Sequence, residues 1–441
     1  MMNNIRTHIK TEIGLMPTDW KITSIGSEFD IQQGKQVSVK TRAGENQKPF
    51  LRTANLFWNR IDLSVLDKMN FNAAEELRMK IKVNDIFVCE GGDIGRTALV
   101  KNELGDIYYQ NHLHRLRIKD NSTNPLFFVF WMMYCWQFTE YYSGAGNKTT
   151  IPNLSQSRLK ALLFPKPEKS EQDAITDILS VIQSAIQKQE QIIKTTSELK
   201  NALMKKVFTE GVKKERLKET EIGLIPESWE VKKIGEIATD FLGGGTPSTS
   251  KEEYWKGKIH WTTSKRLNAE KIYLQDGEKR ITKEAVENSS TNIVPKNNLI
   301  VSTRVTVGKV AINLIDIAIS QDLTGVLIDE NKYSKEFIAF QIQTEKIQNI
   351  FQAQKRGATI KGVTRDDLKD IQLSMPKTKI QQETVARPLL IIDKKITLHQ
   401  TKQIILESLF QSSLHHLMTG SLRVKDSAFN LKKKLAQIEN V

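Results

Sequence analysis

Two long stretches without glycine carry mainly apolar residues at alternating spacings of four and three. The first runs from Glu171 to about Phe208, and the second repeats the same track at an offset of 210 residues, so that Gln189 corresponds to His399. This spacing, sustained over about five heptads, is typical of a coiled coil. The expected seam residues are Ile175, Leu179, Ile182, Ile186, Gln189 and Ile193 in the first stretch, and Leu389, Ile392, Ile396, His399, Leu406 and Phe410 in the second.

The ends of both helices carry stop signals, and one start is marked by a capping residue. Ser170 is the expected N-cap of the first helix, which should end before Gly211. The second should end by Gly420, and Pro388 either kinks it or moves its start to Leu389. A core helix in a bundle is the alternative for each stretch. Their matched length and phase favour each helix as the partner of the other.

An antiparallel pairing would bring the midpoints of the two helices together. Gln189 and His399 would then form a polar layer inside an otherwise apolar seam. Such a layer fixes the register at some cost in stability. For His399, a hydrogen-bonded core histidine is favoured over a metal ligand.

The remainder of the chain is also duplicated. Three pairs of segments correspond at offsets of 209 to 213 residues: TEIGLMPTDW (11–20) with TEIGLIPESW (220–229), GRTALV (95–100) with GKVAIN (308–313), and TIPNLSQSRLK (150–160) with TIKGVTRDDLK (359–369). A fixed period of this kind indicates repeated structural units. The two halves therefore share a frame, while their inner loops differ in length and composition.

Each half begins with a mixed globular unit. Short β-type runs (85–89, 299–305, 324–328) alternate with turn signals and with helical stretches (72–79, 335–351). The expected fold class is α+β, with two homologous mixed α/β domains separated by an antiparallel coiled coil of two long helices. The expected segments are residues 1–167 and 213–376 as globular domains, 168–212 and 377–420 as helices, and 421–441 as a tail.

Composition narrows the partners and the compartment. The 441 residues include 65 Lys and Arg against 51 Asp and Glu, a net charge of +14. Residues 1–200 carry +4 of it, which leaves +10 for the remainder and points to a polyanionic partner. The longest apolar run, Pro125 to Trp136, is too short to span a bilayer and is expected to be buried. With only two cysteines and no secretory signal at the start, a reducing cytoplasm is expected.

Signatures of catalysis are missing. No phosphate-binding Gly-x-x-x-x-Gly-Lys-Ser/Thr loop occurs, and Asn124-Pro125-Leu126-Phe127 lacks the second proline of a methyltransferase loop. Gly243-Gly244-Gly245 is expected to form a turn or a close backbone approach to a ligand. His112 and His114 have no Cys or carboxylate partners at ligand spacing, so no metal site is expected. We expect a protein that recognises a partner and leaves the chemistry to another subunit.

Several of these motifs carry a family resemblance. The doubled TEIG entry, the segments 243–267 and 302–323, and the helices opening near Gln172 and Gln382 resemble the DNA specificity subunit of type I restriction-modification systems. The resemblance covers about residues 11–420 and is weaker in the first half, where QQGKQVSVK (32–40) replaces the Gly-Gly-Thr-Pro entry.

The resemblance implies a function shared among several subunits. Each globular domain would recognise one half of a bipartite site in double-stranded DNA, and the helices would set the gap and dock two methyltransferase subunits. Adenine methylation with S-adenosylmethionine, and DNA cleavage with ATP and Mg²⁺ by restriction subunits, would belong to the partners, with no cofactor bound by this chain. A helix of roughly 57 Å corresponds to about 17 base pairs. The alternative is a coiled-coil protein-interaction scaffold without sequence-specific DNA binding, which would lack steeply salt-dependent duplex binding.

Residues on turns and strand ends are the candidates for DNA contact. Arg and Lys can bond guanine or phosphate, and Asn and Gln can bond adenine. The alternative for each is a solvated charge or a structural hydrogen bond, and Gln110 and Gln321 recur in both halves as a frame position would. The candidates are Lys35, Arg52, Asn55, Arg96, Gln110, Asn111, Arg115, Lys148, Thr149 and Thr150 in the first half, and Ser248, Lys265, Arg266, Arg304, Lys309, Gln321, Lys355, Arg356, Thr359 and Lys361 in the second. The loops 144–150 and 355–361 rank highest.

Overall fold

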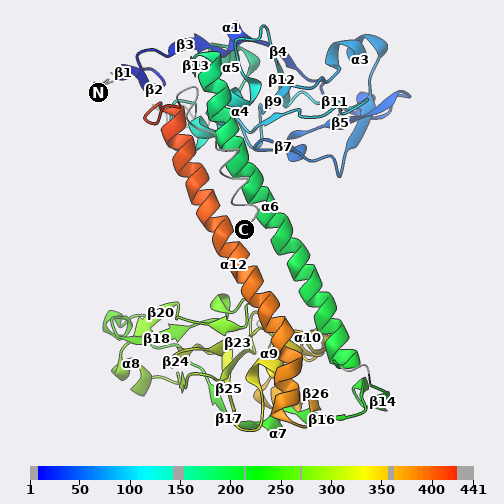
Figure 1. Ribbon diagram of the computed structural model, residues 1–441, viewed down its shortest axis with the longest axis vertical. Coiled ribbons are helices and arrows are strands. Elements are labelled where there is room, and N and C mark those ends of the chain that lie inside the picture. The colour runs from blue at the N-terminus through cyan, green and yellow to red at the C-terminus, as the bar shows by residue number, and fades with distance from the viewer. Residues whose placement is uncertain (1–7, 143–152, 213–214, 269–270, 356–361, 425–441) are drawn as a thin grey trace. The chain divides into compact units, whose positions relative to one another are not determined.

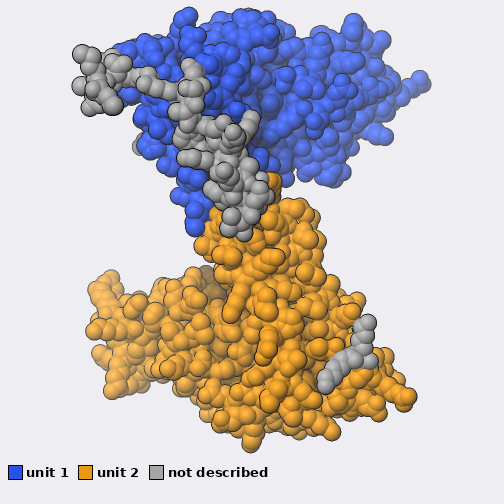
Figure 2. All heavy atoms as spheres, in the orientation of Figure 1, with its two compact units in different colours: residues 1–187, 404–441 blue, residues 188–403 orange. Residues whose placement is uncertain are grey.

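The computed structural model describes residues 8–142, 153–212, 215–268, 271–355 and 362–424. Its contacts divide the chain into two units, one of residues 1–187 and 404–441 and the other of residues 188–403 (Figure 2). The two long helices are α6 (Lys169–Glu210) and α12 (Lys379–Met418). Each unit therefore combines one globular domain with a segment of each long helix (Figure 1).

The first domain contains thirteen of the described strands and five short helices. Its strands are β1 (His8–Thr11), β2 (Gly14–Pro17), β3 (Lys21–Ser24), β4 (Phe29–Gln33), β5 (Gln47–Leu51), β6 (Leu56–Phe57), β7 (Arg60–Ile61), β8 (Asp67–Asn70), β9 (Ile86–Cys89), β10 (Thr97–Leu99), β11 (Tyr108–Tyr109), β12 (Leu113–Ile118) and β13 (Leu163–Lys166). Its helices are α1 (Ile25–Glu28), α2 (Val39–Arg42), α3 (Ala73–Met79), α4 (Pro125–Phe138) and α5 (Gln156–Ala161), with the 3₁₀ turn η1 (Thr53–Asn55).

The second domain repeats most of this order, although β21 and α10 have no counterpart among the described elements of the first. Its strands are β14 (Leu217–Thr220), β15 (Gly223–Pro226), β16 (Trp229–Lys233), β17 (Ala238–Gly243), β18 (Ile259–Thr262), β19 (Tyr273–Leu274), β20 (Lys279–Ile281), β21 (Ile293–Val294), β22 (Leu299–Ser302), β23 (Val310–Asn313), β24 (Ile317–Ile319), β25 (Leu323–Ile328) and β26 (Gln372–Pro376). Its helices are α7 (Ile234–Ile237), α8 (Lys283–Glu287), α9 (Lys335–Ile342), α10 (Glu345–Ala353) and α11 (Arg365–Asp370), with the 3₁₀ turns η2 (Glu252–Trp255) and η3 (Ser264–Arg266).

The two main sheets of each domain correspond in their central strands. An antiparallel sheet has the order β10-β9-β12-β4 in the first domain, and β23-β22-β25-β17 in the second, where β19 extends it. A second sheet pairs β5 parallel with β11 and antiparallel with β8, as β18 pairs parallel with β24 and antiparallel with β20. The expected pair of homologous mixed domains is therefore confirmed.

The repeated TEIG segment forms the same hairpin at the entry of each domain. Strands β1 and β2 pair antiparallel in one, and β14 and β15 in the other. The hydroxyl of Thr11 donates to the carbonyl of Gly14 at 2.7 Å, and Thr220 donates to Gly223 at 2.7 Å. Both glycines have left-handed φ values, +113° and +88°, which residues with a side chain rarely adopt. The repeated letters thus encode one specific turn.

The two long helices are continuous, and their starts differ from the expectation. Helix α6 begins at Lys169, so Ser170 lies in its first turn and the N-cap prediction is wrong. The carbonyl of Glu168 accepts the N–H groups of Glu171 and Gln172 at 2.9 and 3.0 Å, so the helical hydrogen bonds begin before Ser170. Helix α12 begins at Lys379 and runs through Pro388, so the later start at Leu389 is also wrong. The predicted stops are confirmed, because both helices end just before Gly211 and Gly420 in left-handed conformations.

The helical stretch expected at 335–351 is divided. Helix α9 ends at Ile342 and α10 starts at Glu345. Between them the hydroxyl of Thr344 donates to the carbonyl of Gln341 at 2.6 Å. A threonine that bonds the local backbone in this way competes with the helical hydrogen bonds.

Within the second unit the helices run antiparallel. Nδ1 of His399 lies 2.7 Å from Oε1 of Gln189, and Nζ of Lys200 lies 2.6 Å from a carboxylate oxygen of Asp393. Burial, followed by the charges of Lys395 and Lys402, lowers the pKa of His399. A neutral imidazole that donates from Nδ1 satisfies this polar layer. None of the expected seam residues of either helix is exposed.

A joint ties each long helix to its own domain. The side chain of Gln172 accepts the backbone N–H of Asn124 at 2.8 Å and donates to the carbonyl of Pro167 at 2.8 Å. At the 210-residue offset, Gln382 accepts the N–H of Ser334 at 2.8 Å and donates to Pro376 at 3.0 Å. Asn124 and Ser334 are the N-caps of α4 and α9. Each glutamine thus connects the long helix to an apolar helix and to an edge strand.

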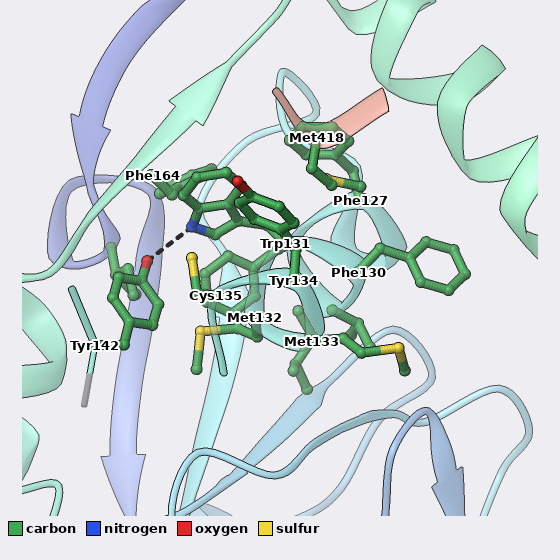
Figure 3. Packing of buried hydrophobic residues seen from close by; sticks show 14 of the residues in the cluster. Phe127, Phe130, Trp131, Met132, Met133, Tyr134, Cys135, Tyr142, Phe164 and Met418 are labelled. Atoms are coloured by element: carbon green, nitrogen blue, oxygen red, sulfur yellow. Dashed lines mark hydrogen bonds between the residues drawn. The ribbon is translucent and has the colours of Figure 1, made fainter. Parts of the chain in front are cut away.

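The core of the first unit surrounds α4, whose apolar residues are buried on every side. Figure 3 shows the indole N–H of Trp131 donating to the hydroxyl of Tyr142 at 2.8 Å. The hydroxyl of Tyr142 in turn donates a hydrogen bond to the carbonyl of Leu163 at 2.7 Å. The same core includes Leu179 of α6 and Phe410 of α12, so the long helices are packed into the domain. The expectation that the run 125–136 is buried is confirmed, and no described helix is long and apolar enough to cross a membrane.

Candidate nucleic-acid interface

Three loops of the first domain converge at one end of its sheets. They are η1 after β5, the turn from β9 to β10, and the turn that precedes β12. Together with the end of β4 they surround a polar cavity of about 460 Å³. Its lining consists of Gln33, Thr53, Glu90, Gly91, Gly92, Asn111, His112 and Asn153. Amide, carboxylate and imidazole groups of this kind can form hydrogen bonds with base edges.

The equivalent loops of the second domain also meet, and Asp322 joins them. Its backbone carbonyl accepts the N–H groups of Thr303 at 2.9 Å and Arg304 at 3.2 Å. Its carboxylate accepts the N–H of Ser264, the first residue of η3, at 2.9 Å. The turn from β22 to β23, the 3₁₀ turn η3 and the turn before β25 are therefore fixed to one another.

The β9–β10 and β22–β23 turns have the same backbone hydrogen bonds. Cys89 donates to the carbonyl of Arg96 at 2.9 Å and accepts from Gly95 at 2.9 Å. Ser302 donates to Lys309 at 2.8 Å and accepts from Gly308 at 2.9 Å. The two domains therefore display different side chains on one backbone frame.

The glycine run at 243–245 serves this frame. A Cβ atom on Gly244 would lie 1.9 Å from the carbonyl oxygen of Ser320, and one on Gly34 would lie 2.2 Å from that of Gln110. The expected close approach of the backbone at Gly244 is therefore to another turn of this chain, the one that precedes β25. Only glycine allows strand β17 to lie against the turn before β25 at this distance.

Most candidate cations of the first domain are bound to carboxylates. Lys35 pairs with Glu75 at 2.5 Å and also donates to the carbonyl of Asn70. Arg52 pairs with Asp67 at 3.3 Å and Arg96 with Asp93 at 2.6 Å. A cation held in this way supports the loops and presents less free charge to phosphate.

Burial argues against two further candidates of the first domain as DNA contacts. Asn55 is 4% exposed, and its amide donates to the carbonyls of Asp62 and Val65. Arg115 is 3% exposed and bonds the carbonyl of Arg78 and the side chain of Gln32. Side chains enclosed in this way do not reach a base edge, so we assign both to the scaffold. Gln110 and Asn111 are half-buried in the turn before β12, and Asn111 lines the cavity.

The second domain presents more free cations. Lys265 and Arg304 are exposed and Lys309 is half-buried, and none of the three has an ion pair among the described residues. Arg266 pairs with Asp276, and Lys355 donates to Gln352. Ser248 and Gln321 are exposed. Lys148, Thr149, Thr150, Arg356, Thr359 and Lys361 lie outside the described residues.

Sequence reasoning named Asn111 but missed Glu90 and Gln33, which also line the cavity. Glu90 is 8% exposed, and Gln33 donates to its Oε2 at 2.6 Å. Nearby, burial lowers the pKa of His114, whose Nε2 lies 2.9 Å from the carbonyl of Leu154. A search for basic residues overlooks Glu90. A comparison of the halves could have found it, because Thr303 takes its place in the second turn.

The described residues contain no group of three His, Cys, Asp or Glu side chains arranged around a common metal position. Asn124, at the proline-containing segment considered above, caps α4 by accepting the N–H groups of Leu126 and Phe127.

Comparison with known proteins identifies the family. The model of the type I restriction modification DNA specificity domain matches residues 17–198 and again 226–408. The chain is 24% identical over 429 residues to the type I restriction enzyme MjaVIII specificity subunit of Methanocaldococcus jannaschii, covering 94% of this chain and 95% of that one. The MjaIX specificity subunit of the same organism is 34% identical over 193 residues, 44% of each chain.

A solved structure has the same fold. The S subunit of a type I restriction-modification system from M. genitalium superposes with a TM-score of 0.60 at 16% sequence identity, covering 95% of this chain and 97% of that one. The two family matches together cover most of the chain, one in each half. The chain therefore belongs to the type I restriction modification DNA specificity domain family: it is a non-catalytic specificity subunit whose two recognition domains confer DNA sequence specificity on a complex of several subunits.

Proposed function

We propose that each domain recognises one half of a bipartite site in double-stranded DNA. The observation that carries this proposal is the arrangement of loops in the two domains. In each domain three loops meet with the same backbone arrangement, but their side chains differ in chemistry. The first presents Glu90, Gln33 and Asn111 around a cavity, and the second presents Lys265, Arg304 and Gln321. Two readers of different half-sites need this combination, because phosphate contacts position a domain while base contacts distinguish sequences.

The second domain makes more of the phosphate contacts in this proposal. Three of its candidate cations, Lys265, Arg304 and Lys309, have no ion pair among the described residues, although Arg266 pairs with Asp276. Those of the first domain are mostly paired. The net charge of +10 after residue 200 supports the same assignment.

The helices set the unread gap and dock two methyltransferase subunits. Helices α6 and α12 have 42 and 40 residues, and a helix of 40 residues is about 60 Å long. At about 3.4 Å per base pair this length corresponds to some 17 or 18 base pairs of duplex.

The chemistry belongs to partner subunits. A methyltransferase subunit methylates adenine with S-adenosylmethionine, and restriction subunits cleave DNA with ATP and Mg²⁺. This chain supplies sequence recognition to both reactions in the cytoplasm. The free, buried thiols of Cys89 and Cys135 suit a reducing compartment.

A map of methylated adenines in the host, with and without this gene, tests the proposal. We expect a bipartite motif that disappears with the gene. Exchanging residues 1–167 for the corresponding segment of a relative should change one half of the motif and leave the other half and the gap unchanged. Exchanging 213–376 should produce the reciprocal result. A motif without two separated halves, or one in which both halves change together, would contradict two independent readers.

A further inference from the structure

The turn between β22 and β23 holds a β-branched residue in the left-handed backbone region. Val305 has a φ of +61°, and side chains branched at Cβ disfavour this conformation strongly. The equivalent residue of the first domain, at the 213-residue offset, is Gly92 with a φ of +72°. The hydrogen bonds that close the two turns are the same. The frame therefore requires a left-handed residue here, and glycine meets that requirement without strain.

The side chain of Val305 contributes little to the stability of the fold. It is 65% exposed, whereas Val307 two residues later is buried. An exposed isopropyl group gains little from the hydrophobic effect, and the strained backbone destabilises the folded state. Folding alone therefore favours glycine at this position, as in the first domain. Strain of this kind, where the surrounding structure enforces it, is concentrated at functional sites.

The surroundings of Val305 indicate what its side chain contacts. Arg304 precedes it in the same turn, and Asp322 fixes that turn to η3, which carries Lys265, and to the turn that carries Gln321. Val305 is thus an apolar group among cationic and amide side chains on the face assigned to DNA. Of the four bases, only thymine presents a methyl group in the major groove, and apolar side chains recognise it by contact.

We propose that Val305 is a specificity-determining residue that contacts the C5 methyl group of a thymine in the half-site of the second domain. The proposal rests on the proposed function, because it requires the second domain to read DNA. It explains why this turn retains a strained valine while its counterpart has glycine.

The test removes the methyl group from the DNA and the isopropyl group from the protein. The full-length chain is assembled with its methyltransferase subunit, and its motif is mapped. Each thymine of the second half-site is then replaced in turn by deoxyuridine, which lacks only the methyl group. We expect one replacement to weaken binding of the unsubstituted protein about fourfold, the effect of losing one buried methyl contact. Val305→Gly should bind the thymine and uracil duplexes equally well, and its unfolding midpoint should rise.

Two further variants separate strain from contact. Val305→Asn tolerates the left-handed conformation and keeps a side chain of similar size, so it should also lose the response to uracil. Asn297→Gly relaxes another left-handed residue, with a φ of +66°, in the turn before β22, and it should retain the response.

The proposal is overturned if no thymine replacement affects the unsubstituted protein, if Val305→Gly keeps the uracil response, or if Val305→Gly unfolds at a lower temperature. A half-site without thymine would do the same, and so would a Val305→Gly defect confined to binding of the methyltransferase subunit. Absence of any bipartite motif for the unsubstituted protein is a different result, since it refutes the proposed function itself.

Discussion

A buried carboxylate faces the cavity of the first domain. Gln33 donates to Oε2 of Glu90, while Oε1 has no hydrogen bond among the described residues. An anionic group repels phosphate, but it accepts a hydrogen bond from the exocyclic amino group of cytosine or adenine. Glu90 therefore suits base recognition better than backbone binding.

We expect Glu90→Gln to relax the preference for one base pair of the first half-site by about 1–3 kcal/mol. The reason is that an amide replaces one acceptor oxygen by a donor. Relative methylation rates on duplexes with single base-pair changes would measure it. Glu28→Gln is the matched control, because Glu28 pairs with Lys166 at 2.6 Å outside the cavity. That control should change stability without changing base preference, and a uniform loss of rate in Glu90→Gln would contradict base reading.

The ion pair of Lys200 and Asp393 lies inside the helix seam of the second unit. The side chains are 6% and 10% exposed, and Lys200 also lies over the ring of Phe340. At the 210-residue offset, Lys200 corresponds to Phe410 and Asp393 corresponds to Gln183, so the seam differs between the units. A buried pair adds little net stability, but loss of one member leaves an unpaired charge.

Lys200→Met should lower the free energy of unfolding by about 3–5 kcal/mol, because it leaves the Asp393 carboxylate buried without a counter-charge. Lys200→Met combined with Asp393→Leu should restore most of the loss, since both charges are then removed. Urea denaturation would compare the three proteins. Equal instability of the single and double variants would show that packing, and not charge, causes the defect.

Burial raises the pKa of Asp393 above its ordinary value of 3.8, against the opposing effect of Lys200. As the pH rises, the carboxyl of Asp393 loses its proton at a lower pH in the unfolded state than in the folded state. The stability that this group contributes at low pH therefore declines between pH 3.8 and its raised folded-state pKa. Asp393→Asn should lack this decline. Unfolding free energies of both proteins across that window would measure the difference, and parallel curves would refute the assignment.

At the scale of elements, the joints at Gln172 and Gln382 fix each long helix to its domain. Each side chain satisfies a buried N–H at the start of an apolar helix and a carbonyl at the end of an edge strand. Both glutamines are fully buried, 0% and 1% exposed. A buried polar group without its partner costs about 1–3 kcal/mol.

Gln172→Ala should therefore destabilise the first domain by about 1–3 kcal/mol, and Gln382→Ala should do the same to the second. Hydrogen exchange gives a local measurement: the N–H of Asn124 should exchange faster in one variant, and that of Ser334 in the other. Gln191→Ala is the control, because Gln191 is exposed and its one side-chain partner among the described residues is Thr195 on the same helix. Unchanged exchange at Asn124 and Ser334 would show that the joints are dispensable.

At the scale of the whole molecule, two copies of one frame differ in the loops at their sheet ends. Hairpins, sheets, turns and glutamine joints recur at offsets of 209 to 213 residues. The loops at the sheet ends carry Glu90 in one copy and Val305 in the other. Under the proposed function, a change to one domain should alter one half of the recognised site.

Duplicating residues 186–192 and 396–402 inserts one heptad into each helix at the polar layer. Because seven residues add about 10.5 Å, the unread gap should lengthen by about three base pairs, while both half-sites stay the same. Methylome sequencing of cells that express the variant would report the gap directly. Insertion into one helix alone should abolish methylation, because it breaks the register of Gln189 and His399. An unchanged gap in the double insertion would show that the helices are not the spacer.

Much of the element pattern was predictable from sequence, because it depends on local spacing. The 4-3 track predicted α6 and α12 and their stops at Gly211 and Gly420. Local rules failed at Thr344, whose hydroxyl bonds the carbonyl of Gln341 between α9 and α10. They also misplaced the start of α6, because the helical hydrogen bonds begin at the carbonyl of Glu168, before the expected cap.

The sequence by itself determined that the chain is two copies of one frame with two matched helices, because repeats and heptads are visible in one dimension. Only the tertiary structure decided which polar residues are available for recognition. Arg115 and Asn55 are enclosed, Lys35 is held by Glu75, and Glu90 and Val305 lie on the loops that converge. The physical reason is that availability depends on burial and ion pairing between residues far apart in the chain, and residue type does not encode either one.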